Sequence, residues 1–203
     1  MERIYTEYNM NIPILKFTGC TNCSMPYGKH SNNIINQGCC WYDAEFDLYD
    51  LKNLVDIEIN IFYNLLEKYT YRIKNNQLYY AIEFPATYHG ENNKCNKICV
   101  FFQENKGCEL PTYARPFICR ITLCPQIRLY LQPEDYQQIR SFIKEAYQHR
   151  LNAIEEIKRQ GNFNSLKSEN IYEVINALKS IPPFPPVKKI HIEIPIKISP
   201  TLK

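Results

Sequence analysis

The sequence predicts an α+β fold in which helices and a short sheet flank a small, irregular, cysteine-rich core. Stretches with an apolar residue at every third or fourth position indicate helices, and stretches with one at every second position indicate strands. Nine cysteines lie in two windows, 20–40 and 95–124, and predict an irregular segment between those elements. With 203 residues the chain has the length of one domain, so we expect 1–203 to fold as a single unit.

The cysteine-cluster region, 17–125, is expected to contain one helix and one strand between its turns. The helix is predicted from about Leu48 to Glu67, where apolar residues recur mostly at three and four positions. The strand is predicted from Gln77 to Phe84, a stretch of aromatic and branched residues that Pro85 ends.

A C-terminal helical part is predicted over 133–180. Pro133 suits the first position of a helix, two acidic residues follow it, and an apolar stripe then continues to the end of the helix before Gly161. A shorter helix is expected next, with Ser168 as its cap.

The terminal segment 187–199 is predicted to be a strand, because isoleucine occupies every second position from Ile190 to Ile198. Pro195 cannot donate a hydrogen bond to a neighbouring strand, so we expect this strand at the edge of a sheet. It either completes the sheet of its own domain or serves as an arm for a protein partner.

The composition argues against several kinds of partner. The net charge is only +3 and the basic residues alternate with acidic ones, so no nucleic-acid partner is expected. No stretch approaches the roughly 18 consecutive apolar residues of a membrane helix, and no secretory signal is visible at the N-terminus. We therefore expect no membrane partner and a cytoplasmic location. Disulfides are disfavoured in that compartment, and metal ligation is the simplest use for nine cysteines.

The spacing of the cysteines suits thiolate ligation and predicts that the irregular core is a metal-binding core. Cys20 and Cys23 form a CxxC pair, in which the intervening turn brings two sulfurs to the same side of an ion. A thioredoxin-like redox role for this pair is disfavoured, because no βαβ pattern surrounds it. The expected ligands of the metal ion or cluster are Cys20, Cys23, Cys39, Cys40, Cys95, Cys99, Cys108 and Cys119. Cys124 is equally compatible with a ligand and with a small buried core residue.

Other side chains near the cysteines are given smaller roles. His30 and His89 are expected to be solvated rather than ligands, and His149 and His191 to lie on the exposed sides of a helix and a strand. Aromatic residues close to the cysteines are expected to shield the site from solvent: Trp41, Phe101 and Phe102.

The segment from Cys108 to Arg120, with the sequence CELPTYARPFICR, resembles the last motif of the YkgJ-type cysteine-cluster proteins. This family is described as zinc- or iron-chelating and is grouped with the cysteine-cluster domain of flagellin lysine N-methylases. The residues that match its motifs are Cys20, Cys23, Cys39, Cys40, Cys99, Cys108, Tyr113, Arg115, Pro116, Cys119 and Arg120. The chain departs from the family in the fifteen residues between Cys23 and Cys39, where the family has only a few, and in the spacing of Tyr113. We nevertheless expect Cys23 and Cys39 to lie close together in the fold.

The two arginines of this segment are expected to support a bound cofactor. Arg115 and Arg120 lie within four residues of Cys119 and can donate hydrogen bonds to sulfur or pair with nearby carboxylates. Thiolate ligands suit both an iron-sulfur cluster and zinc, and the methylase branch of the family favours the cluster. The expected function is that of a metal-binding protein. The alternative that the resemblance implies is a lysine N-methylase-like enzyme acting on flagellin or another protein, although no nucleotide-binding glycine loop is visible.

Overall fold

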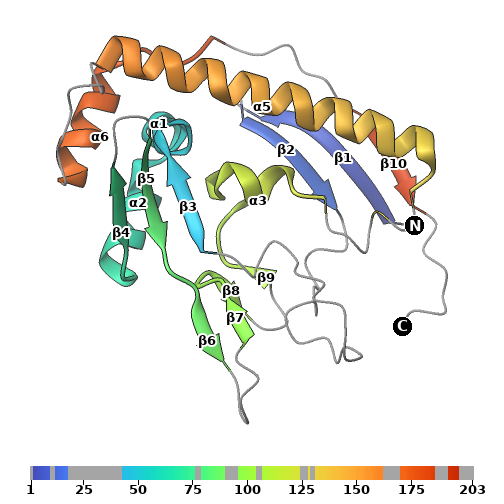
Figure 1. Cartoon of the computed structure of the whole chain (residues 1–203), viewed down its shortest axis with the longest axis horizontal. Coiled ribbons are helices and arrows are strands. Elements are labelled where there is room, and N and C mark those ends of the chain that lie inside the picture. Colours follow the sequence, from blue (N-terminus) through green and yellow to red (C-terminus); the bar gives the residue numbers. More distant parts are fainter. Residues whose placement is uncertain are drawn as a thin grey trace.

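A computed structural model describes residues 2–9, 12–17, 43–75, 79–89, 96–103, 107–123, 128, 131–161, 170–185 and 192–196. Within these ranges, helices pack against small antiparallel sheets, which confirms the α+β class (Figure 1). The strands are β1 Glu2–Asn9, β2 Ile12–Phe17, β3 Ala44–Asp47, β4 Arg72–Asn75, β5 Tyr80–Phe84, β6 Thr87–His89, β7 Asn96–Ile98, β8 Phe102–Gln103, β9 Gly107–Cys108 and β10 Ile192–Ile196. The helices are α1 Leu48–Ile57, α2 Ile59–Lys68, η4 Thr112–Ala114, α3 Phe117–Ile121, α5 Pro133–Gly161 and α6 Ile171–Ser180.

The terminal strand completes a sheet with the first two strands, in the order β10-β1-β2. It pairs antiparallel with β1 and is an outer strand of this sheet, with its Pro195 opposite Arg3 of β1. The predicted edge position is therefore confirmed. The sequence patterns did not predict β1 and β2. In β2 the reason is physical, because Ile12, Pro13 and Ile14 are all buried and the strand therefore lacks alternation.

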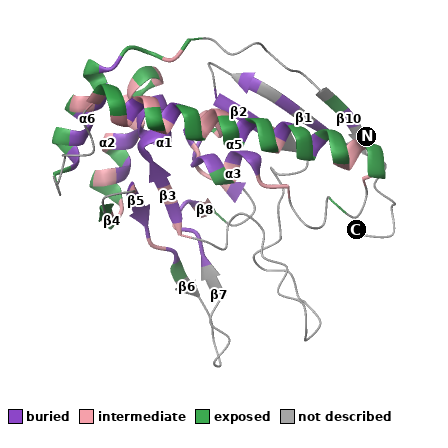
Figure 2. Cartoon of the chain, turned by 45° about the horizontal axis from the view of Figure 1, so that its top comes forward, coloured by how far each residue is buried: buried purple, intermediate pink, exposed green. Residues whose placement is uncertain are grey.

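Helix α5 runs along the molecule above both larger sheets (Figure 1). Its predicted start at Pro133 is confirmed, and it ends at Gly161. Ile139 on its inner side packs against the first sheet, while the outer side of the helix is largely exposed (Figure 2). His149 is half-buried, with its ring 5.8 Å from that of Tyr8, so the prediction that it lies on the exposed side of the helix was wrong. His191 lies outside the described residues.

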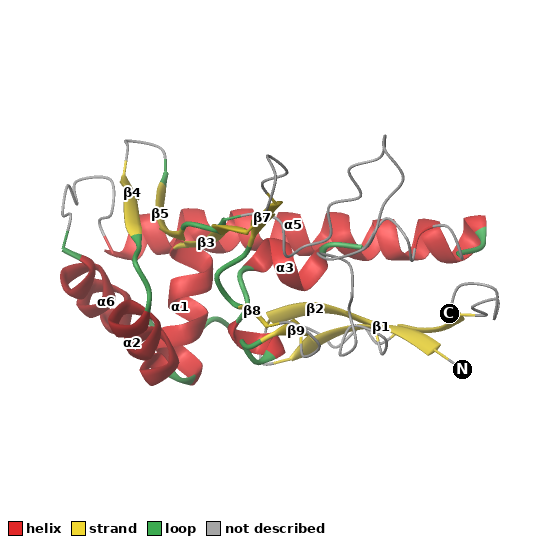
Figure 3. Cartoon of the chain, turned by 90° about the horizontal axis from the view of Figure 1, so that it is seen from below, coloured by secondary structure: helices red, strands yellow, loops and turns green. Residues whose placement is uncertain are grey.

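The second sheet, in the order β3-β5-β4, forms the main core with α1, α2 and α6 (Figure 3). Strand β5 is completely buried, and Phe46 of β3 lies opposite Ile82 of β5. The strand predicted from Gln77 begins at Tyr80, and residues 76–78 are not among those described. The edge strand β4 was not predicted, because its short sequence RIKN has few apolar residues.

The single helix predicted from Leu48 to Glu67 is wrong at Glu58, where the structure has a break between α1 and α2. The backbone of Glu58 leaves the helical region, with φ −163° and ψ 77°. Apolar residues continue at helical spacing across the break, so periodicity could not reveal it. The break lets the apolar faces of both helices contact one core, through Leu51 in α1 and Phe62 in α2.

Helix α6 begins one residue after Asn170, whose side chain accepts a hydrogen bond of 3.0 Å from the backbone N–H of Tyr172. Asn170 is therefore the cap that the structure shows, whereas the expected cap, Ser168, lies outside the described residues. The buried face of α6, which includes Val174 and Leu178, joins the main core. Among the described helices, none combines the length and the apolar character needed to cross a bilayer.

Candidate functional site

Three of the eight predicted ligands lie in the described part of the chain, namely Cys99, Cys108 and Cys119. Cys99 follows β7, Cys108 ends β9, and Cys119 lies in α3. The other five predicted ligands lie outside the described residues: Cys20, Cys23, Cys39, Cys40 and Cys95. The expected proximity of Cys23 to Cys39 therefore also falls outside them. Cys124, His30 and Trp41 lie outside them as well.

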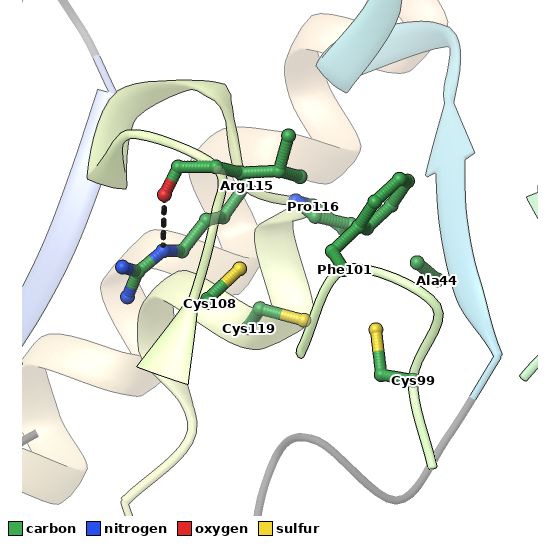
Figure 4. A pocket seen from close by; sticks show the side chains of 8 residues that line it. Ala44, Cys99, Phe101, Cys108, Arg115, Pro116 and Cys119 are labelled. Carbon is green, nitrogen blue, oxygen red and sulfur yellow. Dashed lines mark hydrogen bonds between the residues drawn. The ribbon is translucent and has the colours of Figure 1, made fainter. Parts of the chain in front are cut away.

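The three described cysteines line one pocket together with Ala44, Phe101, Leu110, Arg115 and Pro116. Their sulfur atoms project into the same space between β3, the β8–β9 hairpin and α3 (Figure 4). Cys99 is 7% exposed, while Cys108 and Cys119 are half-buried. The fold thus brings together three thiols from three separate backbone elements.

Short backbone elements hold Cys99 and Cys108. The carbonyl oxygen of Cys99 accepts a hydrogen bond of 3.0 Å from the N–H of Phe102, which forms a turn that leads into β8. Phe102 lies opposite Cys108 in the β8–β9 pair. Gly107 begins β9 with φ 79°, a conformation that glycine adopts without steric cost. Cys99 therefore lies in the turn that leads into the β8–β9 pair, and Cys108 lies within that pair.

Proline fixes the start of the helix that carries Cys119. Pro116 precedes α3, and its carbonyl oxygen accepts a hydrogen bond of 2.9 Å from the N–H of Cys119. The helix buries Phe117, Arg120 and Ile121 against the protein. Cys119 is left half-buried at the side of the helix that lines the pocket.

The pocket has an apolar wall and one cationic side chain. Phe101 is 1% exposed, and its ring lies 5.1 Å from that of Tyr69 and 5.2 Å from that of Phe84. Of the aromatic residues expected to shield the cysteines, Phe101 lines the pocket. Arg115 lies in the wall, and its Nε donates a hydrogen bond of 3.0 Å to the carbonyl oxygen of Leu110 (Figure 4).

Arg120 is 1% exposed and pairs with a carboxylate, one of the two roles that its position predicted. Its Nη2 lies 2.5 Å from Oδ1 of Asp50, a residue of α1 that is 4% exposed. The other oxygen of Asp50 accepts a hydrogen bond of 3.0 Å from the N–H of Phe117. The guanidinium also lies over the Tyr49 ring, 5.8 Å from its centroid. Asp50 therefore ties α1 to α3.

Sequence reasoning missed Asp50. An acidic residue in the first turn of a helix is commonly explained by the helix dipole, and Asp50 is 70 residues from Arg120 in the chain. No local signal therefore identifies the pair.

A second ion pair lies beside the first. Asp47 caps α1 by accepting a hydrogen bond of 3.0 Å from the N–H of Asp50, and Nε of Arg150 donates to its second oxygen at 2.7 Å. Burial and the neighbouring Asp47 raise the pKa of the Asp50 carboxyl to about 7, although Arg120, the Phe117 N–H and Arg150 oppose the rise. Two carboxylates and two guanidiniums thus connect α1, α3 and α5.

The pocket offers sulfur donors of the kind that bind metals, but within the described residues it does not offer a complete set of ligands around one point. Three soft sulfur donors face an apolar cavity, which suits zinc or an iron-sulfur cluster. A closed thiolate site for zinc takes four donors. Over the residues that the structure describes, no group of three or more His, Cys, Asp or Glu side chains is arranged to hold an ion. A complete site therefore requires movement of these three thiols or donors from elsewhere in the chain.

No family model, curated protein or solved structure matches the chain.

Proposed function

We propose that the protein binds an iron-sulfur cluster or zinc through thiolates, with Cys99, Cys108 and Cys119 among the ligands. The observation that carries the proposal is the convergence of these three cysteines on one pocket. Cys99 and Cys108 also contact the main hydrophobic core, whereas Cys119 is not among the residues of that core and reaches the same pocket from a separate helix. The remaining ligands are drawn from Cys20, Cys23, Cys39, Cys40 and Cys95.

The residues around the thiols support this role. Arg115 is among the residues that line the pocket, and a cationic side chain next to a thiolate site would offset part of its negative charge. Phe101 and Ala44 supply apolar surface that limits the access of water to the sulfurs. Bound zinc would hold the surrounding segments together, whereas an iron-sulfur cluster would supply electron transfer.

Anaerobic purification followed by measurement of zinc, iron and acid-labile sulfide per chain tests the proposal. Colourless protein with stoichiometric zinc and no sulfide identifies a zinc site, and brown protein with iron and sulfide identifies a cluster. Protein that contains neither metal, and whose thiols all react with a thiol reagent after mild treatment with reductant, contradicts the proposal.

A further inference from the structure

The helix that carries Cys119 is too short to be stable without support from the rest of the protein. Helix α3 has five residues, Phe117–Ile121, and an isolated helix in water is marginal below about 12 residues. Its orientation must therefore come from contacts with neighbouring elements.

Asp50 contacts this helix at two points. One carboxylate oxygen accepts from the backbone N–H of Phe117 and the other from the side chain of Arg120, at 3.0 and 2.5 Å. Phe117 and Arg120 are three residues apart and therefore share one face of the helix. The N–H of Phe117 is the first of the helix and points along its axis, whereas the Arg120 side chain leaves the helix nearly one turn further on. The two bonds therefore hold both the start of α3 and its rotation about its own axis.

The rotation of α3 determines where the sulfur of Cys119 lies. Successive residues in a helix are about 100° apart around the axis, so Cys119 lies on a different face from the two residues that Asp50 holds. Phe117 and Arg120 are buried against the protein, while Cys119 lines the pocket. Without the two Asp50 bonds the packing of Phe117 and Ile121 still holds the helix, but its rotation is less tightly fixed and the thiol can shift relative to Cys99 and Cys108.

The energy of the buried Asp50–Arg120 pair is consistent with a role in orienting α3. Burial of the Asp50 carboxylate is unfavourable enough to raise its pKa despite the adjacent guanidinium. Buried ion pairs of this kind contribute little net stability, because removal of the charges from water offsets their attraction. The geometry that they impose is therefore their clearer effect.

We propose that Asp50 is a positioning residue for the thiol pocket, which orients Cys119 by holding Phe117 and Arg120 on a different side of α3. The functional part of this inference depends on the proposed metal site, whereas the structural part concerns the thiol alone.

The test compares Asp50→Asn with Asp56→Asn in the full-length protein. Asp56 lies in the same helix and pairs with the buried ammonium of Lys52, so its loss also disturbs a buried charge. The contacts of α3 through Phe117 and Arg120 remain in that control. Arg120→Lys is a second variant that keeps the charge, but an ammonium cannot reproduce the planar geometry of a guanidinium.

The first measurement is the alkylation rate of each cysteine by iodoacetamide in metal-free protein, followed by mass spectrometry. We expect Asp50→Asn to change the rate of Cys119 several-fold, with Cys99 and Cys108 close to wild type. Arg120→Lys should give a smaller change at the same residue, and Asp56→Asn none. The proposal is overturned if Cys119 reacts equally fast in wild type and Arg120→Lys and if, in addition, Asp50→Asn either leaves that rate unchanged or does not fold. A uniform rise at all three cysteines also overturns it, because that result indicates general loosening.

The second measurement is zinc affinity in competition with a chromophoric chelator. We expect Asp50→Asn to weaken binding by about 10- to 100-fold, the usual loss when a residue that supports a ligand is replaced. Asp56→Asn should bind as wild type does. If wild type binds neither zinc nor a reconstituted cluster while Cys119 still responds selectively, the proposed function fails and the positioning role of Asp50 stands. If wild type binds metal and Asp50→Asn binds it equally well, the positioning role is overturned.

Discussion

Ile194 in the last strand lies directly opposite Ile4 in the first strand, so the two ends of the described chain meet in one sheet. Both side chains are buried and pack against Ile139 of α5. This contact attaches the long helix to the sheet. The terminal strand is therefore part of the protein's own fold.

Replacement of Ile194 by alanine should lower the free energy of unfolding by about 2 to 4 kcal/mol, because it leaves a cavity beside Ile4 and Ile139. Urea denaturation followed by circular dichroism measures the change. Glu193→Ala is the matched control, since Glu193 is exposed on the same strand and its loss should cost clearly less than that of Ile194. Equal effects of the two substitutions would contradict the packing of β10 on the helix.

Phe101→Ala should open the thiol pocket as well as destabilise the core. Phe101 lines the pocket beside Cys99 and packs against Phe84 and Tyr69, so its truncation should cost about 3 to 5 kcal/mol. The reaction rate of Cys99 with a thiol reagent should rise at the same time. Phe102→Ala provides the comparison, because Phe102 is half-buried in the adjacent position. A faster reaction of Cys99 in Phe102→Ala than in Phe101→Ala would show that Phe101 does not shield the pocket.

Glu109 should stabilise the protein in a pH-dependent way. Tyr69 and Lys68 both donate hydrogen bonds to its carboxylate, and these bonds lower the pKa of Glu109 although burial opposes them. A carboxyl whose pKa is lower in the folded state contributes stability above its unfolded pKa of about 4.3. That contribution is lost as the pH falls through the folded pKa.

The measurement is the difference in unfolding free energy between wild type and Glu109→Gln. This difference should be constant from about pH 6 to 7 and should shrink as the pH is lowered below about 4. Tyr69→Phe removes one donor and should move the decrease toward higher pH. A difference that does not vary with pH would show that the carboxylate makes no net contribution through its charge.

Lys52 should depend on Asp56 for its place in the core. The Lys52 side chain is completely buried, contacts Asp56 one helical turn away, and lies 5.9 Å from the centroid of the Phe184 ring. Asp56→Asn leaves the ammonium without its counter-charge and should cost about 1 to 3 kcal/mol. The double variant Lys52→Met with Asp56→Asn should recover most of this loss in chemical denaturation. If the double variant is as unstable as the two single losses combined, the charges do not act as a pair.

Long and uninterrupted patterns made some elements predictable. The stripe that begins at Pro133 and the alternation that includes Ile194 each extend over enough residues to identify α5 and β10. The break at Glu58 and the buried strand β2 were not predictable, because tertiary packing rather than local pattern determines them. Single positions such as Glu58 carry too little information to interrupt a continuing helical period.

Some residues of the candidate site were likewise predictable from the sequence, and others were not. Cys99, Cys108 and Cys119 could be grouped from their residue type and spacing, and the structure places them in one pocket. Asp50 could not be grouped with them, because its contact with Arg120 exists only after α1 and α3 pack together. Sequence therefore identified three cysteines of the pocket, whereas the contact of Asp50 with the helix that carries Cys119 was visible only in the fold.

Extended X-ray absorption fine structure of the bound metal, recorded on wild type and Cys119→Ala, tests most directly the claim that thiolates of this pocket bind the metal. If thiolates of this pocket hold the metal, wild type should show a first shell of sulfur, at about 2.3 Å for zinc. The sulfur count should fall in the Cys119→Ala protein, or the metal should be lost. A first shell of only nitrogen and oxygen, or a sulfur shell identical in both proteins, would contradict the assignment of this pocket as the metal site.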